Sequence, residues 1–132
     1  PKTLIMGSYG IGVSRLLATL AESKNDNLGL AWPISVAPAF IHIVAAGKDL
    51  NIYKTAYNIA KKLENNNIEI ILDDRQISAG VKFKDAELLG VPYILTVGQA
   101  LANSAVEIKK RDGTEKKLIK LDKIIDYVNQ IR

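Results

Sequence analysis

The sequence contains no cysteine and only one histidine among its 132 residues. Without thiols, neither a disulfide framework nor a thiolate metal site can form, and a single imidazole has no second histidine with which to share a metal. Long apolar runs are also lacking, since the stretch 34–46 is interrupted by Pro38 and His42 and is too short to cross a bilayer. No basic segment with a cleavage site precedes it, so we expect a cytoplasmic protein that binds neither a membrane nor a metal.

The composition that is present fits one ordinary globular unit. Hydrophobic residues make up 48% of the chain and charged residues 24%, which is enough for one core and little more than one domain. The net charge of +4 permits a polyanionic partner without demonstrating one. Because the sequence starts at Pro1 and enters a strand-like run at once, we expect a piece of a longer protein.

The first part of the chain predicts a strand, a glycine loop and a helix. Residues 3–6 are apolar, three glycines follow within residues 7–12, and apolar side chains then recur at helical spacing over residues 13–22. Pro33 and Pro38 interrupt the pattern further on. We therefore place residues 1–28 in one unit, residues 29–38 in a linker and residues 39–132 in a second domain.

Beyond the prolines, strands and helices alternate. The pattern predicts strands at 40–46, 68–72 and 93–97 and helices at 50–63 and 82–89. Two further strands, 105–111 and 116–120, flank the hairpin signal Asp112-Gly113, and a closing helix is expected over 121–131. This alternation indicates an α/β fold with a mainly parallel sheet and a terminal hairpin.

The glycine loop before the first helix is a candidate phosphate site. Its glycines allow close backbone approach, the following helix offers free N–H groups, and Arg15 adds a positive charge. The spacing G-x-x-G-x-G matches neither the dinucleotide fingerprint nor a P-loop. On the residues alone, a packing turn and a nucleotide site are equally good interpretations.

Several runs together resemble the bacterial prolyl-tRNA synthetases. The segment Met6-Gly-Ser-Tyr-Gly-Ile-Gly-Val-Ser-Arg15 is similar to motif 3 of class II aminoacyl-tRNA synthetases in the form that this family carries. The similarity continues through Gly29-Leu-Ala-Trp-Pro33, Leu72-Asp-Asp-Arg75 and Gly90-Val-Pro92, in the family's order and approximate spacing. The resemblance implies a strand-loop-helix remnant of the class II catalytic domain, followed by a three-layer α/β/α anticodon-binding domain with a mixed, mainly parallel five-stranded sheet.

The resemblance also implies a function for the N-terminal motif. In this family the motif 3 arginine contacts ATP, which assigns a catalytic, ATP-binding role to Arg15 and places Ser8, Gly10 and Gly12 beneath the adenylate and proline. The parent enzyme, a cytoplasmic homodimer, would activate proline with ATP, assisted by Mg²⁺, and transfer it to tRNA(Pro). Motifs 1 and 2 are absent from this sequence, so we expect the isolated chain to be inactive and to bind no cofactor.

The residues after the second predicted strand form the expected anticodon site. Open α/β sheets usually bind ligands at this edge, and a carboxylate there can accept the N1–H and N2–H groups of the two guanines that end proline anticodons. Basic side chains would hold phosphate or the guanine O6/N7 edge, and one ring would stack on a base. The expected carboxylates are Asp73, Asp74 and Glu87, the basic residues are Arg75, Lys82 and Lys84, and the ring is Phe83.

Alternative interpretations remain open at this point. For the cluster, Asp74 would cap a turn and pair with Arg75, and Phe83 would belong to the core. For the whole chain, the alternatives are a class II synthetase for glycine, threonine or histidine, a non-catalytic paralogue that binds RNA or protein, and a flavodoxin-like nucleotide-binding domain. We expect His42 to be structural, and we interpret the lysines of the hairpin as protection of an edge strand against aggregation.

Overall fold

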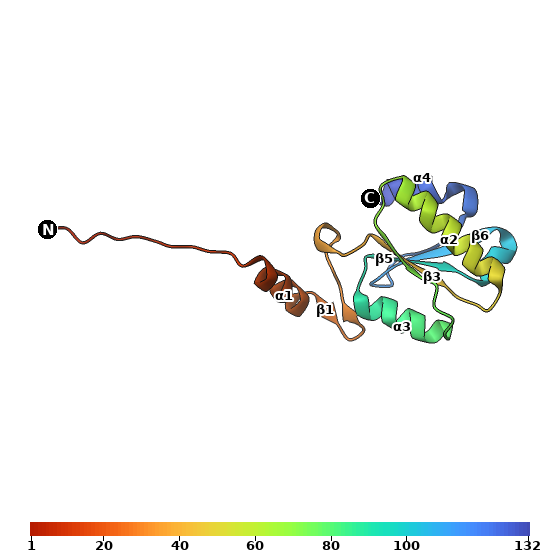
Figure 1. Ribbon diagram of the computed structural model, residues 1–132, viewed down its shortest axis with the longest axis horizontal. Coiled ribbons are helices and arrows are strands. Elements are labelled where there is room, and N and C mark those ends of the chain that lie inside the picture. The colour runs from red at the N-terminus through yellow and green to blue at the C-terminus, as the bar shows by residue number, and fades with distance from the viewer.

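The computed structural model describes all residues from Pro1 to Arg132 (Figure 1). An extended N-terminal segment leads into helix α1 (Val13–Ser23), and a three-layer body follows, with helices on both faces of one sheet. All buried residues lie at or beyond Ala39, so the core belongs to the body. None of the helices combines the length and the apolar character that crossing a bilayer requires.

The strand expected at residues 3–6 is absent. Residues 1–12 form neither helix nor strand, and no segment of the chain pairs with them. A β-strand needs a hydrogen-bonded neighbour, which an apolar run cannot supply by itself. The helix expected after the glycines is present as α1, although Leu16 and Leu17 on its apolar face are half-exposed.

The sheet has five strands in the order β4-β3-β5-β6-β7. The central strand β3 (Ile41–Ala45) is parallel to β4 (Ile70–Asp73) and to β5 (Tyr93–Val97). The hairpin of β6 (Ala105–Lys110) and β7 (Lys116–Lys120) is added to β5 in antiparallel fashion. The mixed five-stranded sheet expected from the sequence is confirmed, with parallel and antiparallel pairings in equal number.

Helices α2 (Leu50–Asn65) and α4 (Ile124–Ile131) cover one face of the sheet, and α3 (Ala79–Leu89) covers the other (Figure 1). A short 3-10 turn precedes α4. Side chains alternate along a strand, so Ile41 and Ile43 join the large core under α2, whereas Val44 joins the small cluster under α3. The three-layer α/β/α arrangement is thereby confirmed.

A small hairpin that the sequence pattern did not reveal spans the expected boundary between residues 1–28 and the linker 29–38. Strands β1 (Asn25–Asp26) and β2 (Gly29–Leu30) pair antiparallel, and a 3-10 turn, Ile34–Val36, follows them. The hairpin lies against the C-terminal end of α3, where Gly90 ends that helix in a left-handed conformation with φ 72°. The segment between the expected units is thus an ordered element that contacts the body.

Candidate nucleic-acid interface

The three parallel strands end at the same edge of the sheet, and two hollows open there. Both hollows border the start of α3 and share Ala46 and Ala79. The large hollow has a volume of about 750 Å³ and is lined by Ala46, Gly47, Lys48, Leu50, Tyr53, Gln76, Ile77, Ser78 and Ala79. The small hollow has a volume of about 300 Å³ and is lined by Ala46, Ala79, Phe83, Thr96, Gly98, Gln99, Ala100 and Glu107.

Asp73 and Arg75 form a fixed pair at the end of β4. The Arg75 Nε donates to Asp73 Oδ1 at 2.9 Å, and its Nη2 donates to Asp73 Oδ2 at 2.7 Å and to Asp85 Oδ2 at 2.6 Å. The Asp73 side chain is 4% exposed and that of Arg75 is 51% exposed. These hydrogen bonds lower the pKa of Asp73 and raise the pKa of Arg75. Asp73 therefore holds Arg75 in place, while Arg75 remains accessible from solvent.

Lys82 lies inside the protein, which corrects the expected phosphate contact. Its residue exposure is 0%, and its Nζ donates to the carbonyl oxygen of Ala45 at 2.7 Å and to that of Asp73 at 3.4 Å. The Nζ also lies 5.0 Å from the ring centroid of Tyr53. Because both carbonyl groups terminate strands of the sheet, the buried ammonium ties the ends of β3 and β4 together.

The remaining expected residues differ in their access to the two hollows. Phe83 packs against the small hydrophobic cluster under α3 and also lines the small hollow. Its ring therefore belongs to the core on one side and is available to a ligand on the other. Asp74 and Lys84 are exposed, and the carboxylate of Asp74 has no hydrogen-bond or ion-pair partner. Glu87 lies one turn beyond Phe83 on α3, pairs with Lys109 at 3.0 Å and lines neither hollow.

The structure also adds residues that the sequence pattern did not single out for anticodon binding. Ser78 precedes α3, and the N–H groups of Ala79 and Gly80 in its first turn have no partner within the chain. Such free N–H groups favour an anion. The Tyr53 hydroxyl donates to the carbonyl oxygen of Gly47 at 3.0 Å and fixes the loop that carries Lys48. For Lys48 and for residues 78–80 the only signal was their position in loops between a predicted strand and a predicted helix, and Tyr53 lies within the predicted helix 50–63.

The residues of the N-terminal motif do not form a pocket in this chain. Ser8, Gly10 and Gly12 lie on the extended segment, and Arg15 lies on α1, all of them exposed. No other part of the chain packs around residues 1–12, because none of the strands or helices of the body reaches them. The expected contacts of these four residues with ATP and proline stay a prediction.

His42 lies in β3 and faces α3. The residue is 2% exposed, and neither ring nitrogen has a hydrogen-bond partner. Burial lowers the pKa of the imidazole, which favours the neutral form. The ring borders a hollow of about 360 Å³ between β4 and α3, together with Asp73, Arg75 and Asp85. Its position is compatible with the expected structural role.

Comparison with known proteins adds to this geometry. The family described as the anticodon binding domain matches residues 39–131. A proline--tRNA ligase of a Nocardioides species is 50% identical over 127 residues, which cover 96% of this chain and 22% of that protein. The proline--tRNA ligase of Mycobacterium ulcerans is 52% identical over 113 residues, 86% of this chain and 19% of that protein. The chain thus spans about a fifth of the length of these curated relatives.

Proposed function

Because this chain belongs to the anticodon-binding domain family, we propose that it is the C-terminal part of a proline–tRNA ligase and that it binds the anticodon of tRNA(Pro). The observation that carries the proposal is the identity of 50% over 96% of the chain with a protein of that name. The relatives favour proline over glycine, threonine or histidine, and the family match favours RNA binding over a flavodoxin-like nucleotide site.

The two hollows suit two neighbouring unstacked bases. Ala46 and Ala79 line both hollows, so the two hollows adjoin and can receive consecutive nucleotides of one strand. Phe83 offers its ring to the base in the small hollow. The exposed carboxylate of Asp74, which has no partner within the chain, offers an acceptor to guanine N1–H and N2–H. Glu107 lines the small hollow, where its Oε2 pairs with Lys116 at 2.9 Å and its Oε1 is left to accept from a base.

The phosphates between these bases would lie over the first turn of α3. The unpartnered N–H groups of Ala79 and Gly80 are there. The exposed guanidinium of Arg75 borders the third hollow, between β4 and α3, and its Nη1, unused within the chain, offers a contact to a neighbouring phosphate. Lys82 and Asp73 act indirectly in this proposal, because they position the strand ends and Arg75. Glu87 is not assigned a base contact in this proposal, because it lines neither hollow and its carboxylate pairs with Lys109 at 3.0 Å.

The activity of the full-length protein is part of the same proposal. It would activate proline with ATP and Mg²⁺ and transfer it to tRNA(Pro), with Arg15 on the nucleotide and Ser8, Gly10 and Gly12 beneath it. The uncovered apolar face of α1 supports this, since an exposed apolar stripe on a helix usually packs against further protein. A cytoplasmic homodimer is proposed from the family resemblance alone.

Binding of tRNA transcripts to this chain tests the proposed function. Replacing either of the two anticodon guanines by cytosine should weaken binding by roughly 5- to 150-fold, because a lost base-specific contact costs about 1 to 3 kcal/mol. Fluorescence anisotropy at one fixed salt concentration measures this effect, and a base-pair exchange in the acceptor stem serves as the matched control. Equal affinity for the unmodified transcript, both guanine variants and the control would contradict anticodon binding by this chain.

A further inference from the structure

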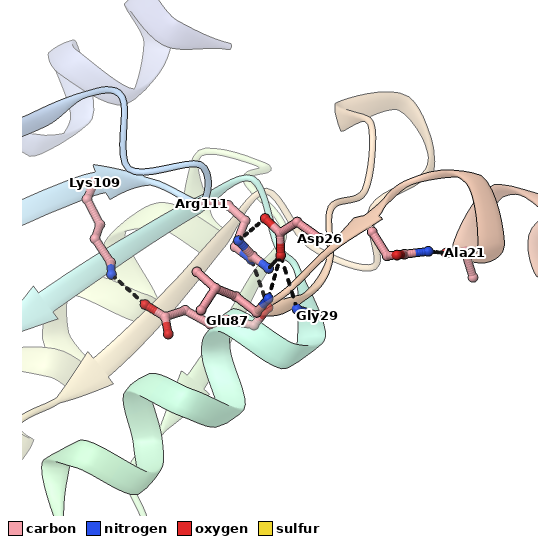
Figure 2. A network of polar contacts seen from close by, with 8 residues as sticks. Ala21, Asp26, Gly29, Glu87, Lys109 and Arg111 are labelled. Carbon is pink, nitrogen blue, oxygen red and sulfur yellow. Dashed lines mark hydrogen bonds and ion pairs between the residues drawn. The ribbon is translucent and has the colours of Figure 1, made fainter.

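Arg111 joins three segments that are far apart in the sequence, and it does so away from the two hollows. The residue is 5% exposed and follows directly after β6. Its Nε donates to the carbonyl oxygen of Glu87 at 2.7 Å, while Nη1 and Nη2 donate to the two carboxylate oxygens of Asp26 at 3.0 and 2.8 Å. Figure 2 shows the guanidinium between the hairpin β1-β2 and the last turn of α3.

The carboxylate of Asp26 serves two purposes at once. Its Oδ1 accepts the N–H groups of Leu28 and Gly29 at 2.8 and 3.1 Å, which closes the turn of the hairpin. The hydrogen bond from Arg111 and that from Leu28 lower the pKa of Asp26 to about 2. The charged pair therefore persists at neutral pH, and a bidentate arginine–carboxylate pair fixes an orientation as well as a distance.

A second set of contacts joins the hairpin to α1. The Nδ2 of Asn25 donates to the carbonyl oxygens of Ala21 and Glu22 at 3.0 and 2.7 Å, which satisfies carbonyl groups at the end of that helix. The N–H group of Ala31 donates to the carbonyl oxygen of Lys24 at 2.9 Å. The direction of α1 thus depends on the position of the hairpin.

The hairpin lies on α3 with backbone against backbone. A Cβ at Gly29 would come within 2.5 Å of Leu88 Cα, and a Cβ at Gly90 within 2.0 Å of the Leu30 carbonyl oxygen. The N–H group of Trp32 donates to the carbonyl oxygen of Gly90 at 3.1 Å. Only glycine allows such an approach, and no flexible side chain separates the two elements.

From these contacts we infer that the pair of Asp26 and Arg111, which we name the latch, fixes the direction of α1 relative to the anticodon-binding edge. The 11 residues of α3 connect the two sites, since its first turn borders the hollows and its last turn holds the latch. The inference rests on the proposed function, in which α1 belongs to the catalytic part. Asp26 and Arg111 are then positioning residues for aminoacyl transfer.

The physical reason is that a tRNA binds both parts of the enzyme together. If the anticodon-binding domain swings on its linker, each site keeps its own geometry, but the acceptor end no longer reaches the activated amino acid reliably. A displacement of about 1 Å at a reacting centre can cost on the order of 100-fold in rate. Loss of the latch should therefore reduce transfer and spare both proline activation and tRNA binding.

The variant Asp26→Asn in the full-length enzyme tests the latch. An asparagine can still accept the turn N–H groups but loses the charged bidentate pair. We expect kcat for aminoacylation to fall by about 10-fold or more, with ATP–pyrophosphate exchange and the Kd for tRNA(Pro) changed by less than about 2-fold. Hydrogen exchange of the amides at residues 25–31 should become faster in the variant, which would confirm that the hairpin has loosened.

Asp112→Asn is the matched control, because Asp112 Oδ1 also accepts an N–H group two residues on, from Thr114 at 2.9 Å, but forms no hydrogen bond or ion pair with the hairpin β1-β2. This control should leave kcat unchanged. An unchanged kcat for aminoacylation in Asp26→Asn would overturn the proposed latch. An equal loss in ATP–pyrophosphate exchange or in tRNA binding would also overturn it, because such a loss indicates a general structural defect. An unmutated enzyme that does not aminoacylate tRNA(Pro) would instead refute the proposed function.

Discussion

Replacement of Arg75 by alanine is expected to weaken binding of tRNA(Pro) by roughly 10- to 150-fold, because a hydrogen bond to a charged group contributes about 1.5 to 3 kcal/mol. Two carboxylates hold the guanidinium at the edge of the sheet, where its side chain stays 51% exposed. Its Nη1 has no partner within the chain and is free to meet a phosphate. Titration of the chain with labelled tRNA measures the change.

Lys62→Ala provides the matched control for this substitution. Lys62 is exposed in the last turn of α2, at the opposite edge of the sheet, and its removal changes the net charge by the same amount. We expect its effect on affinity to be small, since charges beyond about 10 Å are largely screened at physiological salt. If both variants lost affinity equally, Arg75 would contribute only general electrostatic attraction. If neither variant lost affinity, Arg75 would not belong to the interface.

Replacement of Lys82 by alanine is expected to reduce the free energy of unfolding by about 3 kcal/mol. Truncation of a buried long side chain leaves a cavity, which costs about 2 to 5 kcal/mol, and the carbonyl oxygen of Ala45 loses a donor. The shorter side chain also gives up the contact with the ring of Tyr53. Urea denaturation followed by circular dichroism measures the change in the midpoint and in the free energy.

Two further variants separate the causes of this loss. Lys84→Ala, on the same helix but exposed, should change stability by no more than about 0.5 kcal/mol, because surface substitutions rarely do more. Lys82→Met keeps most of the volume and removes the ammonium, so it should lose less stability than Lys82→Ala. If Lys82→Ala were as stable as Lys84→Ala, the buried ammonium could not be the tie between β3 and β4 that we describe.

The regular elements of the body could be predicted because their patterns are local. Residues 93–97 form a strand with the bounds expected from the run of apolar and β-branched side chains. The hairpin of β6 and β7 follows from Asp112-Gly113, where Gly113 has a φ of 73°. The run at residues 3–6 has a similar pattern but no partner strand, so local propensity alone does not make it a strand.

The roles within the cluster could not be predicted, because they depend on which side chains face inward. A lysine on a helix is compatible with either a phosphate or a buried carbonyl group, and only the order of the strands places the carbonyls of Ala45 and Asp73 beneath Lys82. Alternation along β4 could have indicated that Asp73 and Asp74 face differently. The partner of Arg111 lies 85 residues away, and no local signal identifies it.

The central claim is that the anticodon binds at the edge of the sheet where α3 begins, and a nuclear magnetic resonance titration tests it most directly. Amide signals of the labelled chain would be followed while an anticodon stem-loop RNA of tRNA(Pro) is added. Shifts should concentrate at residues 46–48, 74–81 and 98–100 and should largely disappear when both guanines are replaced by cytosine. Shifts that gather on the C-terminal half of α2 or on β7, or that persist without the guanines, would contradict the claim.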